Sequence, residues 1–181
     1  MNYRLSRIAA ICGGKFSGCD SEVRSVVTDS RSLSCELGCR PMFVAMRGAN
    51  HDSHDFIAGM QSRGVRAFLV ERGVEASSCT GECGFVQVDN AIEALQRLAA
   101  YHRAQFRGTV VGITGSNGKT VIKEWIAEEL PAGMKYYRSP KSYNSQLGVP
   151  LSVLMLEGDE RLAIFEAGIS KPGEMERLER I

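Results

Sequence analysis

The sequence has no large excess of charge of either sign. Its 22 lysine and arginine residues against 21 aspartate and glutamate residues give a net charge of +1 at neutral pH. A chain so close to neutrality offers no electrostatic argument for binding nucleic acid or an anionic membrane surface. We therefore expect no nucleic-acid partner.

Long apolar runs are missing as well. No stretch of the sequence approaches the roughly 20 apolar residues of a membrane-spanning helix. Near the N-terminus the apolar run Ile8–Cys12 is too short for the core of a signal peptide. Internal repeats and low-complexity tracts are also absent. These absences predict no membrane insertion, and we expect a cytoplasmic protein.

Six cysteines are present, in a pattern that is only loosely like a metal site. Cys35 and Cys39 are four residues apart, as are Cys79 and Cys83. Zinc ligands can have such spacing, but both pairs lie in polar, turn-rich segments and two intervening residues would be more diagnostic. We expect free thiols, with a structural zinc as the alternative.

The most informative segment is residues 114–120, with the sequence TGSNGKT. It follows the apolar, β-branched run 109–113 and precedes a helical pattern over 121–130. Strand, glycine-rich turn, Lys-Thr and helix is the order found in a phosphate-binding loop. Backbone N–H groups of such a turn, at the positive end of a helix, bind phosphate oxygens. Lys119 is expected to reach the β- and γ-phosphates and Thr120 to bind Mg²⁺.

The glycines of this segment depart from the strict pattern GxxxxGK(S/T). That pattern requires glycine at position 113, where this chain has Ile113, and the neighbouring glycines are Gly112 and Gly115. A Gly-Lys-Thr triplet alone also occurs in ordinary strand-to-helix turns. The flanking elements favour a nucleotide site. Its expected ATP-binding residues are Gly115, Ser116, Asn117, Gly118, Lys119 and Thr120.

The predicted fold class is α/β, in two units. For the first unit the patterns predict helices at 3–12 and 55–62, strands at 23–27, 41–46, 67–70 and 85–88, and a long helix from the Asp89-Asn90 cap to about 106. For the second they predict strands at 109–114, 135–138 and 161–166, with helices at 118–130, about 145–156 and from 172. Alternating strands and helices imply a parallel sheet. The predicted domains are 1–107 and 108–181.

Two further polar residues are candidates for the nucleotide site. Glu166 ends the apolar strand 161–166, and parallel strands bring their carboxyl ends to one sheet edge. An acid at such a position commonly holds the Mg²⁺ of phosphate-loop enzymes, although a solvated carboxylate would look the same in sequence. Asn144 is the other candidate, and the alternative for it is a helix N-cap.

Three motifs resemble the Mur ligase family, the ATP-dependent amide-bond ligases of peptidoglycan precursor synthesis. They are residues 112–120 (GITGSNGKT), 144–151 (NSQLGVPL) and 165–174 (FEAGISKPGE). The family tolerates the shifted glycine. The last two motifs look most like the subgroup that adds D-alanyl-D-alanine. The first unit also resembles that subgroup's UDP-binding domain, through residues 28–31 (TDSR), 42–48 (MFVAMRG) and 52–56 (DSHDF), although position 53 is usually glycine or alanine there.

The resemblance implies site residues and partners. ATP would phosphorylate the carboxylate of UDP-N-acetylmuramoyl-tripeptide, and D-alanyl-D-alanine would attack the acyl phosphate. Lys119 and Glu166 would be the catalytic residues, Thr120 and Glu166 the Mg²⁺ ligands, and Asn144 a further ATP-binding residue. Ser30, Arg31 and Arg47 would contact the UDP-sugar, since the planar guanidinium fork suits a diphosphate. The expected roles extend to cell shape and cell division.

Family members are more than twice as long as this chain. The missing part would include a carbamylated lysine that helps to hold a second Mg²⁺, and a domain that binds the incoming amine. The resemblance therefore implies an N-terminal fragment that is inactive alone, from a full-length protein expected to be a monomer. The alternatives are a related ligase with another amino-acid or folate substrate, and a nucleotide-binding module that does not ligate.

Overall fold

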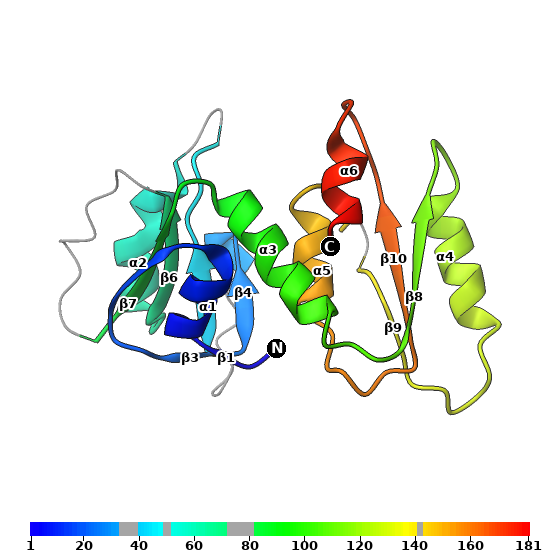
Figure 1. The fold of residues 1–181 in the computed structure, drawn as a ribbon, viewed down its shortest axis with the longest axis horizontal. Helices are drawn as coiled ribbons and strands as arrows, with labels where there is room; N and C mark the ends of the chain where they lie inside the picture. The colour runs from blue at the N-terminus through cyan, green and yellow to red at the C-terminus, as the bar shows by residue number, and fades with distance from the viewer. Residues whose placement is uncertain (33–39, 49–51, 72–81, 141–142) are drawn as a thin grey trace. The chain divides into compact units, whose positions relative to one another are not determined.

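The structure is a computed structural model that describes residues 1–32, 40–48, 52–71, 82–140 and 143–181. It divides into two compact units, Met1–Ala94 and Leu95–Ile181. This division falls inside helix α3 (Ala91–Arg103), and the domain boundary expected at 107 and 108 stays a prediction. Both units combine helices with largely parallel sheets, which confirms the predicted α/β class (Figure 1). No helix in the described residues is long and apolar enough to cross a membrane.

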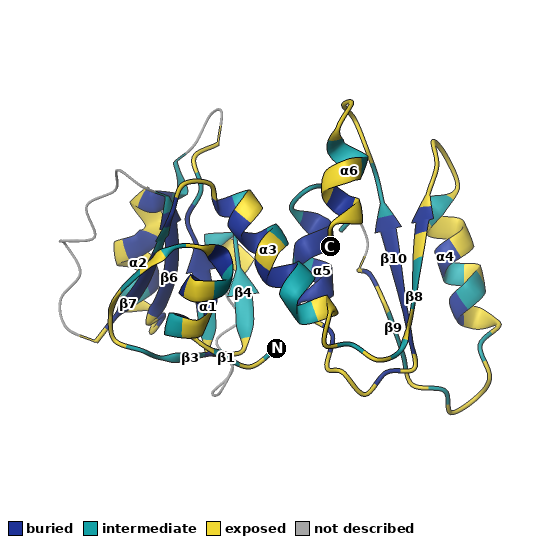
Figure 2. Cartoon of the chain, viewed as in Figure 1, coloured by how far each residue is buried: buried dark blue, intermediate teal, exposed yellow. Residues whose placement is uncertain are grey.

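The first unit is built on a five-stranded sheet in the order β2-β7-β6-β5-β4. Its strands are β2 (Lys15–Gly18), β4 (Ser25–Val27), β5 (Pro41–Val44), β6 (Ala67–Glu71) and β7 (Gly84–Val88). Strands β4 to β7 are parallel, and β2 runs antiparallel at the edge beside β7. The central strand β6 is buried along four of its five residues (Figure 2). A parallel strand covered on both faces is expected to be a continuous apolar run, as β6 is.

Helices cover both faces of this sheet. Helix α2 (Ile57–Ser62), with the short turn η2 (Ser53–Phe56) before it, contributes Ile57 and Met60 to the core around Phe43, Phe68 and Phe85. Alternate residues of the same strands point to the opposite face. There α1 (Leu5–Cys12) packs on β7, and Gly13 ends it in the left-handed conformation.

Several elements of the first unit differ from the predictions. Tyr3–Arg4 is not helical but forms β1, paired with β3 (Glu22–Val23). The strand expected over 23–27 is interrupted at Arg24 and continues as β4, and the next strand ends at Val44 rather than at 46. Most of the residues between β6 and β7 lie outside the described residues, as do Cys35, Cys39 and Cys79. Cys12, Cys19 and Cys83 are not in disulfide bonds.

The second unit contains a three-stranded parallel sheet in the order β8-β10-β9. Its strands are β8 (Thr109–Thr114), β9 (Tyr136–Arg138) and β10 (Leu162–Ala167), close to the predicted ranges. Helix α4 (Lys119–Glu128) packs on β8 and β10, and its residues join the core at Ile113 and Ile164. Helix α5 (Gly148–Val153) also packs on β10 and is shorter than predicted, and α6 (Glu174–Glu179) follows β10.

Candidate nucleotide site

The turn between β8 and α4 has the backbone of a phosphate-binding loop. Gly115 has a φ of 145° and Gly118 a φ of 77°, values that side-chain-bearing residues rarely adopt. Gly118 is the N-cap of α4, and its carbonyl accepts the hydrogen bond of Ile122 N–H. The N–H groups at the start of the helix therefore lie next to an exposed loop. Position 113 needs no glycine, because Ile113 is a buried strand residue paired with Glu166.

Lys119 lies at the mouth of this loop. Its Nζ donates a hydrogen bond to the carbonyl oxygen of Gly115 over 2.7 Å. The neighbouring loop residues, 114–118, are exposed. The lysine charge is therefore held beside the loop, within reach of a phosphate group that enters it.

The parallel pairing of β8 with β10 brings Thr120 and Glu166 together. Ile113 pairs with Glu166 and Thr114 with Ala167, so both strands end at the same edge. Thr120 Oγ1 donates to Glu166 Oε2 over 3.0 Å, although 46 residues separate the two in sequence. The predicted meeting of the loop with the end of the third strand is thus present in the structure.

Glu166 is 1% exposed, and a second lysine neutralises its charge. Lys123 Nζ lies 2.7 Å from Glu166 Oε1 and also donates to the carbonyl oxygen of Ser139 over 2.7 Å. The Glu166 N–H donates to Ser139 Oγ over 3.2 Å. Lys123, which is 0% exposed, was not among the residues predicted from the sequence. The available signal was its spacing of four residues before the buried Ala127, since residues four apart lie on the same face of a helix.

The donor set fits a Mg²⁺ ion. Mg²⁺ prefers oxygen ligands, keeps several waters and takes only one or two carboxylates. Glu166 and Thr120 supply one carboxylate and one hydroxyl at the loop. Glu166 Oε2 already lies beside the Thr120 hydroxyl, whereas Oε1 faces the Lys123 ammonium group.

Asn144 lies beside the end of β10. Its carbonyl oxygen accepts a hydrogen bond from Gly168 N–H over 2.7 Å. The alternative N-cap role is not met, since the structural N-cap of α5 is Leu147 and the nearby Gly148 N–H donates to Ser145 Oγ. Asn144 is therefore close to Glu166 along the strand, at the same edge of the sheet.

The residues expected to contact the UDP-sugar follow neighbouring strands of the first unit. Ser30 and Arg31 come after β4 and Arg47 after β5, so all three lie towards the carboxyl edge of that sheet. The exposed Arg31 guanidinium donates to both carboxylate oxygens of Asp29 and lowers the pKa of Asp29 to about 2. Arg47 Nε lies 3.5 Å from Asp52 Oδ2, a longer contact than that of Arg31 with Asp29.

His54 is buried in the first unit, with a side chain that is 5% exposed. Its Nε2 accepts a hydrogen bond from Glu71 N–H over 3.2 Å, and its Nδ1 contacts the Asp52 carboxylate. An imidazole that accepts at Nε2 must carry its proton at Nδ1, and so can donate to Asp52. His54 thereby ties Asp52 to the end of β6. Its signal in the sequence was weak, because a histidine among polar residues is usually exposed.

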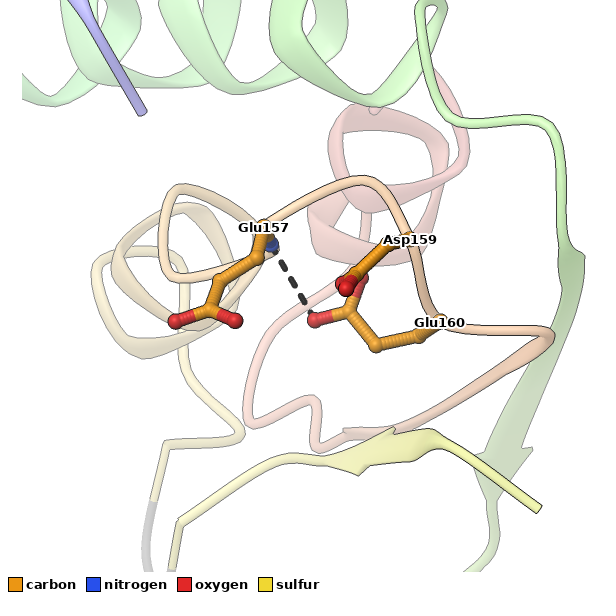
Figure 3. A group of neighbouring side chains, drawn as sticks. All are labelled: Glu157, Asp159 and Glu160. Carbon is orange, nitrogen blue, oxygen red and sulfur yellow. Dashed lines mark hydrogen bonds between the residues drawn. The ribbon is translucent and has the colours of Figure 1, made fainter.

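An acidic cluster, Glu157, Asp159 and Glu160, lies in the turn before β10 (Figure 3). Its ligand oxygens lie within 4.8 Å of one another. Lys135 pairs with Glu157 and Asp159, and Glu160 accepts hydrogen bonds from the backbone N–H groups of residues 157 and 158. The cluster is therefore explained as a turn stabilised by a lysine.

Comparisons with known proteins agree with this geometry. Residues 113–181 match the model of the Mur ligase middle domain. The chain is similar to Mur ligases in this region and over most of its length. It is 31% identical over 159 residues to the UDP-N-acetylmuramoyl-tripeptide–D-alanyl-D-alanine ligase of Bacillus subtilis. This alignment covers 88% of this chain and 34% of that protein. The Escherichia coli ligase of the same name is 33% identical over 175 residues, 97% of this chain and 37% of that protein.

Solved structures of Mur ligases show the same fold. The crystal structure of MurF from Acinetobacter baumannii aligns with a TM-score of 0.85 and 27% identity, over 98% of this chain and 38% of that one. MurF from Thermotoga maritima, solved in complex with ADP, aligns with a TM-score of 0.72 and 31% identity, over 86% of this chain and 34% of that one. The chain thus spans about a third of the length of the Mur ligases it matches.

Proposed function

We propose that this chain is the N-terminal part of an ATP-dependent ligase that adds D-alanyl-D-alanine to UDP-N-acetylmuramoyl-tripeptide. The observation that supports this most strongly is the contact of Thr120 with Glu166 beside the Gly115–Lys119 loop, in a chain similar to such ligases over most of its length. We also propose that the domains are 1–107 and 108–181, and that the full-length protein is a cytoplasmic monomer acting in cell-wall synthesis, with roles in cell shape and division.

The reaction must turn a poor electrophile into a good one. An oxygen of the tripeptide carboxylate attacks the γ-phosphorus of ATP, and the bond to the β-phosphate oxygen breaks to release ADP. The amine of D-alanyl-D-alanine then attacks the acyl carbon, loses a proton and displaces inorganic phosphate. In the first step the γ-phosphoryl group must be held in line between the attacking carboxylate oxygen and the leaving oxygen of ADP, and its negative charge must be neutralised.

The residues of the loop position the phosphate groups and neutralise their charge. The N–H groups at the start of α4 bind phosphate oxygens, and Lys119 moves from the Gly115 carbonyl to the β- and γ-phosphates. Ser116 and Asn117 belong to the same loop, and Asn144 lies beside the end of β10, at the same edge of the sheet. A Mg²⁺ ion held by Thr120 and Glu166 would neutralise phosphate charge when bound.

The first unit would hold the other end of the acceptor. We propose that Ser30, Arg31 and Arg47 contact the UDP-sugar, because they lie after adjacent parallel strands and include two guanidinium groups. Ligands of open α/β sheets bind at this carboxyl edge. The Asp29 carboxylate orients Arg31 before any ligand arrives.

The test uses the full-length protein with ATP, Mg²⁺, UDP-N-acetylmuramoyl-tripeptide and D-alanyl-D-alanine. We expect release of one phosphate for each pentapeptide product seen by mass spectrometry. A product formed only when another amino acid replaces D-alanyl-D-alanine would indicate a different ligase of the family. Nucleotide binding without turnover on any of these amines would instead indicate a module that does not ligate.

A further inference from the structure

Lys123 has a position that the proposed mechanism does not use. It lies on the inner face of α4 and is 0% exposed, while Lys119, one turn earlier, faces the open loop. Its ammonium group lies 2.7 Å from Glu166 Oε1 and donates to the carbonyl oxygen of Ser139. A buried ammonium group is expected only where an opposite charge compensates it.

Glu166 is the compensating charge. Glu124 Oε1 is also 3.4 Å from Lys123 Nζ, but Glu124 is 32% exposed and pairs with Arg138 as well. Glu166 is buried as completely as Lys123, and its Oε1 has no aligned hydrogen bond from any described residue. The carboxylate that would hold the metal is therefore already neutralised by a cation inside the protein.

We propose that Lys123 is an internal counter-ion that keeps the metal site weak until a nucleotide is bound. A divalent cation at Glu166 must share the carboxylate with the Lys123 ammonium group. Two positive charges on one buried carboxylate repel each other strongly. The nucleotide adds phosphate oxygens that Lys123 does not neutralise. Metal and nucleotide would then bind cooperatively, and each raises the affinity of the other by the same factor.

A purely structural role for Lys123 makes a different prediction. If the lysine served only to stabilise the packing of α4 on β10, its removal would lower the thermal stability and leave metal affinity unchanged or lower. An internal counter-ion must instead oppose the metal. Loss of the lysine charge should then raise the affinity of the nucleotide-free site for a divalent cation, although it lowers stability.

The experiment is a titration of the nucleotide-free, full-length protein with Mn²⁺, followed by the electron paramagnetic resonance signal of free Mn²⁺. We expect Lys123→Met to bind Mn²⁺ at least tenfold more tightly than the wild type, and Lys123→Met with Glu166→Gln to lose the gain. Lys15→Met is the matched control, since it removes one exposed lysine charge from β2 and should change the affinity less than twofold. In the presence of ATP the difference between Lys123→Met and wild type should shrink.

Thermal unfolding shows whether each variant is folded. If Lys123→Met does not fold, Lys123→Gln replaces it, because a neutral amide still donates to the Ser139 carbonyl and the same tenfold gain is expected. Equal or weaker Mn²⁺ binding by the folded variant would overturn the proposal. The inference rests on the proposed metal site, but it is separable from the proposed reaction, since absence of ligation would leave the Mn²⁺ comparison intact.

Discussion

Two lysines one turn apart on α4 have opposite surroundings. Lys119 contacts an exposed loop carbonyl, whereas Lys123 is enclosed between β10 and the segment after β9. Residue type alone does not distinguish them. Their positions do, because only the first lies at the helix N-terminus, where phosphate groups bind. These surroundings support the proposed phosphate-binding role of Lys119 and the proposed counter-ion role of Lys123.

Replacing Lys119 tests the first of these roles. We expect Lys119→Ala to lower the rate of ATP-dependent ligation by about 100-fold or more, as is common on loss of one preorganised charge contact. Thermal stability should hardly change, since the lysine contacts only its own loop. Phosphate release by the full-length protein measures the rate, with Lys15→Ala as the control. A rate within a few-fold of the wild type would remove Lys119 from the mechanism.

Replacing Arg31 tests the proposed UDP-sugar site of the first unit. We expect Arg31→Ala to weaken binding of UDP-N-acetylmuramoyl-tripeptide about tenfold or more, because a charge-assisted hydrogen bond to an anion contributes roughly 1.5–3 kcal/mol. Isothermal titration measures the affinity. Arg24→Ala is the control, an exposed arginine at the opposite end of β4 that pairs with Glu22. Unchanged affinity in Arg31→Ala would place the diphosphate elsewhere.

At the scale of elements, the apolar strands and the capped helices were predictable from sequence. β6, β8 and β10 are short apolar runs between turn signals, and Asn90 caps α3 as expected, its Oδ1 accepting from Glu93 N–H. β2 escaped prediction because three of its four residues are exposed and it forms only by pairing with β7. The burial of Lys123 had only a weak signal, its spacing from Ala127, because its ionic partner Glu166 is distant in the sequence.

The loop between β8 and α4 makes a prediction about its glycines. At Gly118 a side chain would meet no neighbour, but the φ of 77° is costly for alanine, by about 1–2 kcal/mol. Gly118→Ala should therefore distort the loop and weaken ATP binding. Gly112→Ala is the matched control, because that glycine has open space around it and does not have a left-handed φ. Isothermal titration with ATP compares the two, and equal affinities would contradict the loop assignment.

At the scale of the whole molecule, the chain contains one proposed phosphate loop and one candidate metal carboxylate in a small sheet. Among the described residues, β8 pairs only with β10, so its other edge offers unpaired backbone groups. Beside it, a hollow of about 360 Å³ is lined mainly by apolar side chains of β8, β10, α5 and α6, including Val110, Phe165 and Leu178. The free edge of β8 and this apolar hollow are therefore available to contact another protein segment.

The 181-residue chain should therefore neither ligate nor stay fully monomeric. We expect weak nucleotide binding, dimers or larger species in sedimentation velocity, and no phosphate release above background with both substrates present. Turnover on the order of 1–10³ per second, ordinary for an enzyme, would show that the catalytic machinery is complete within these residues.

Hydrogen–deuterium exchange of the full-length protein, with and without ATP and Mg²⁺, tests the nucleotide site most directly. Binding at the loop must protect the backbone N–H groups that would hold the phosphates. We predict that peptides covering residues 113–122 gain protection, that those covering 84–94 do not, and that Lys119→Ala reduces the gain. Protection by ATP that leaves residues 113–122 unchanged would contradict the assignment of this loop as the phosphate site.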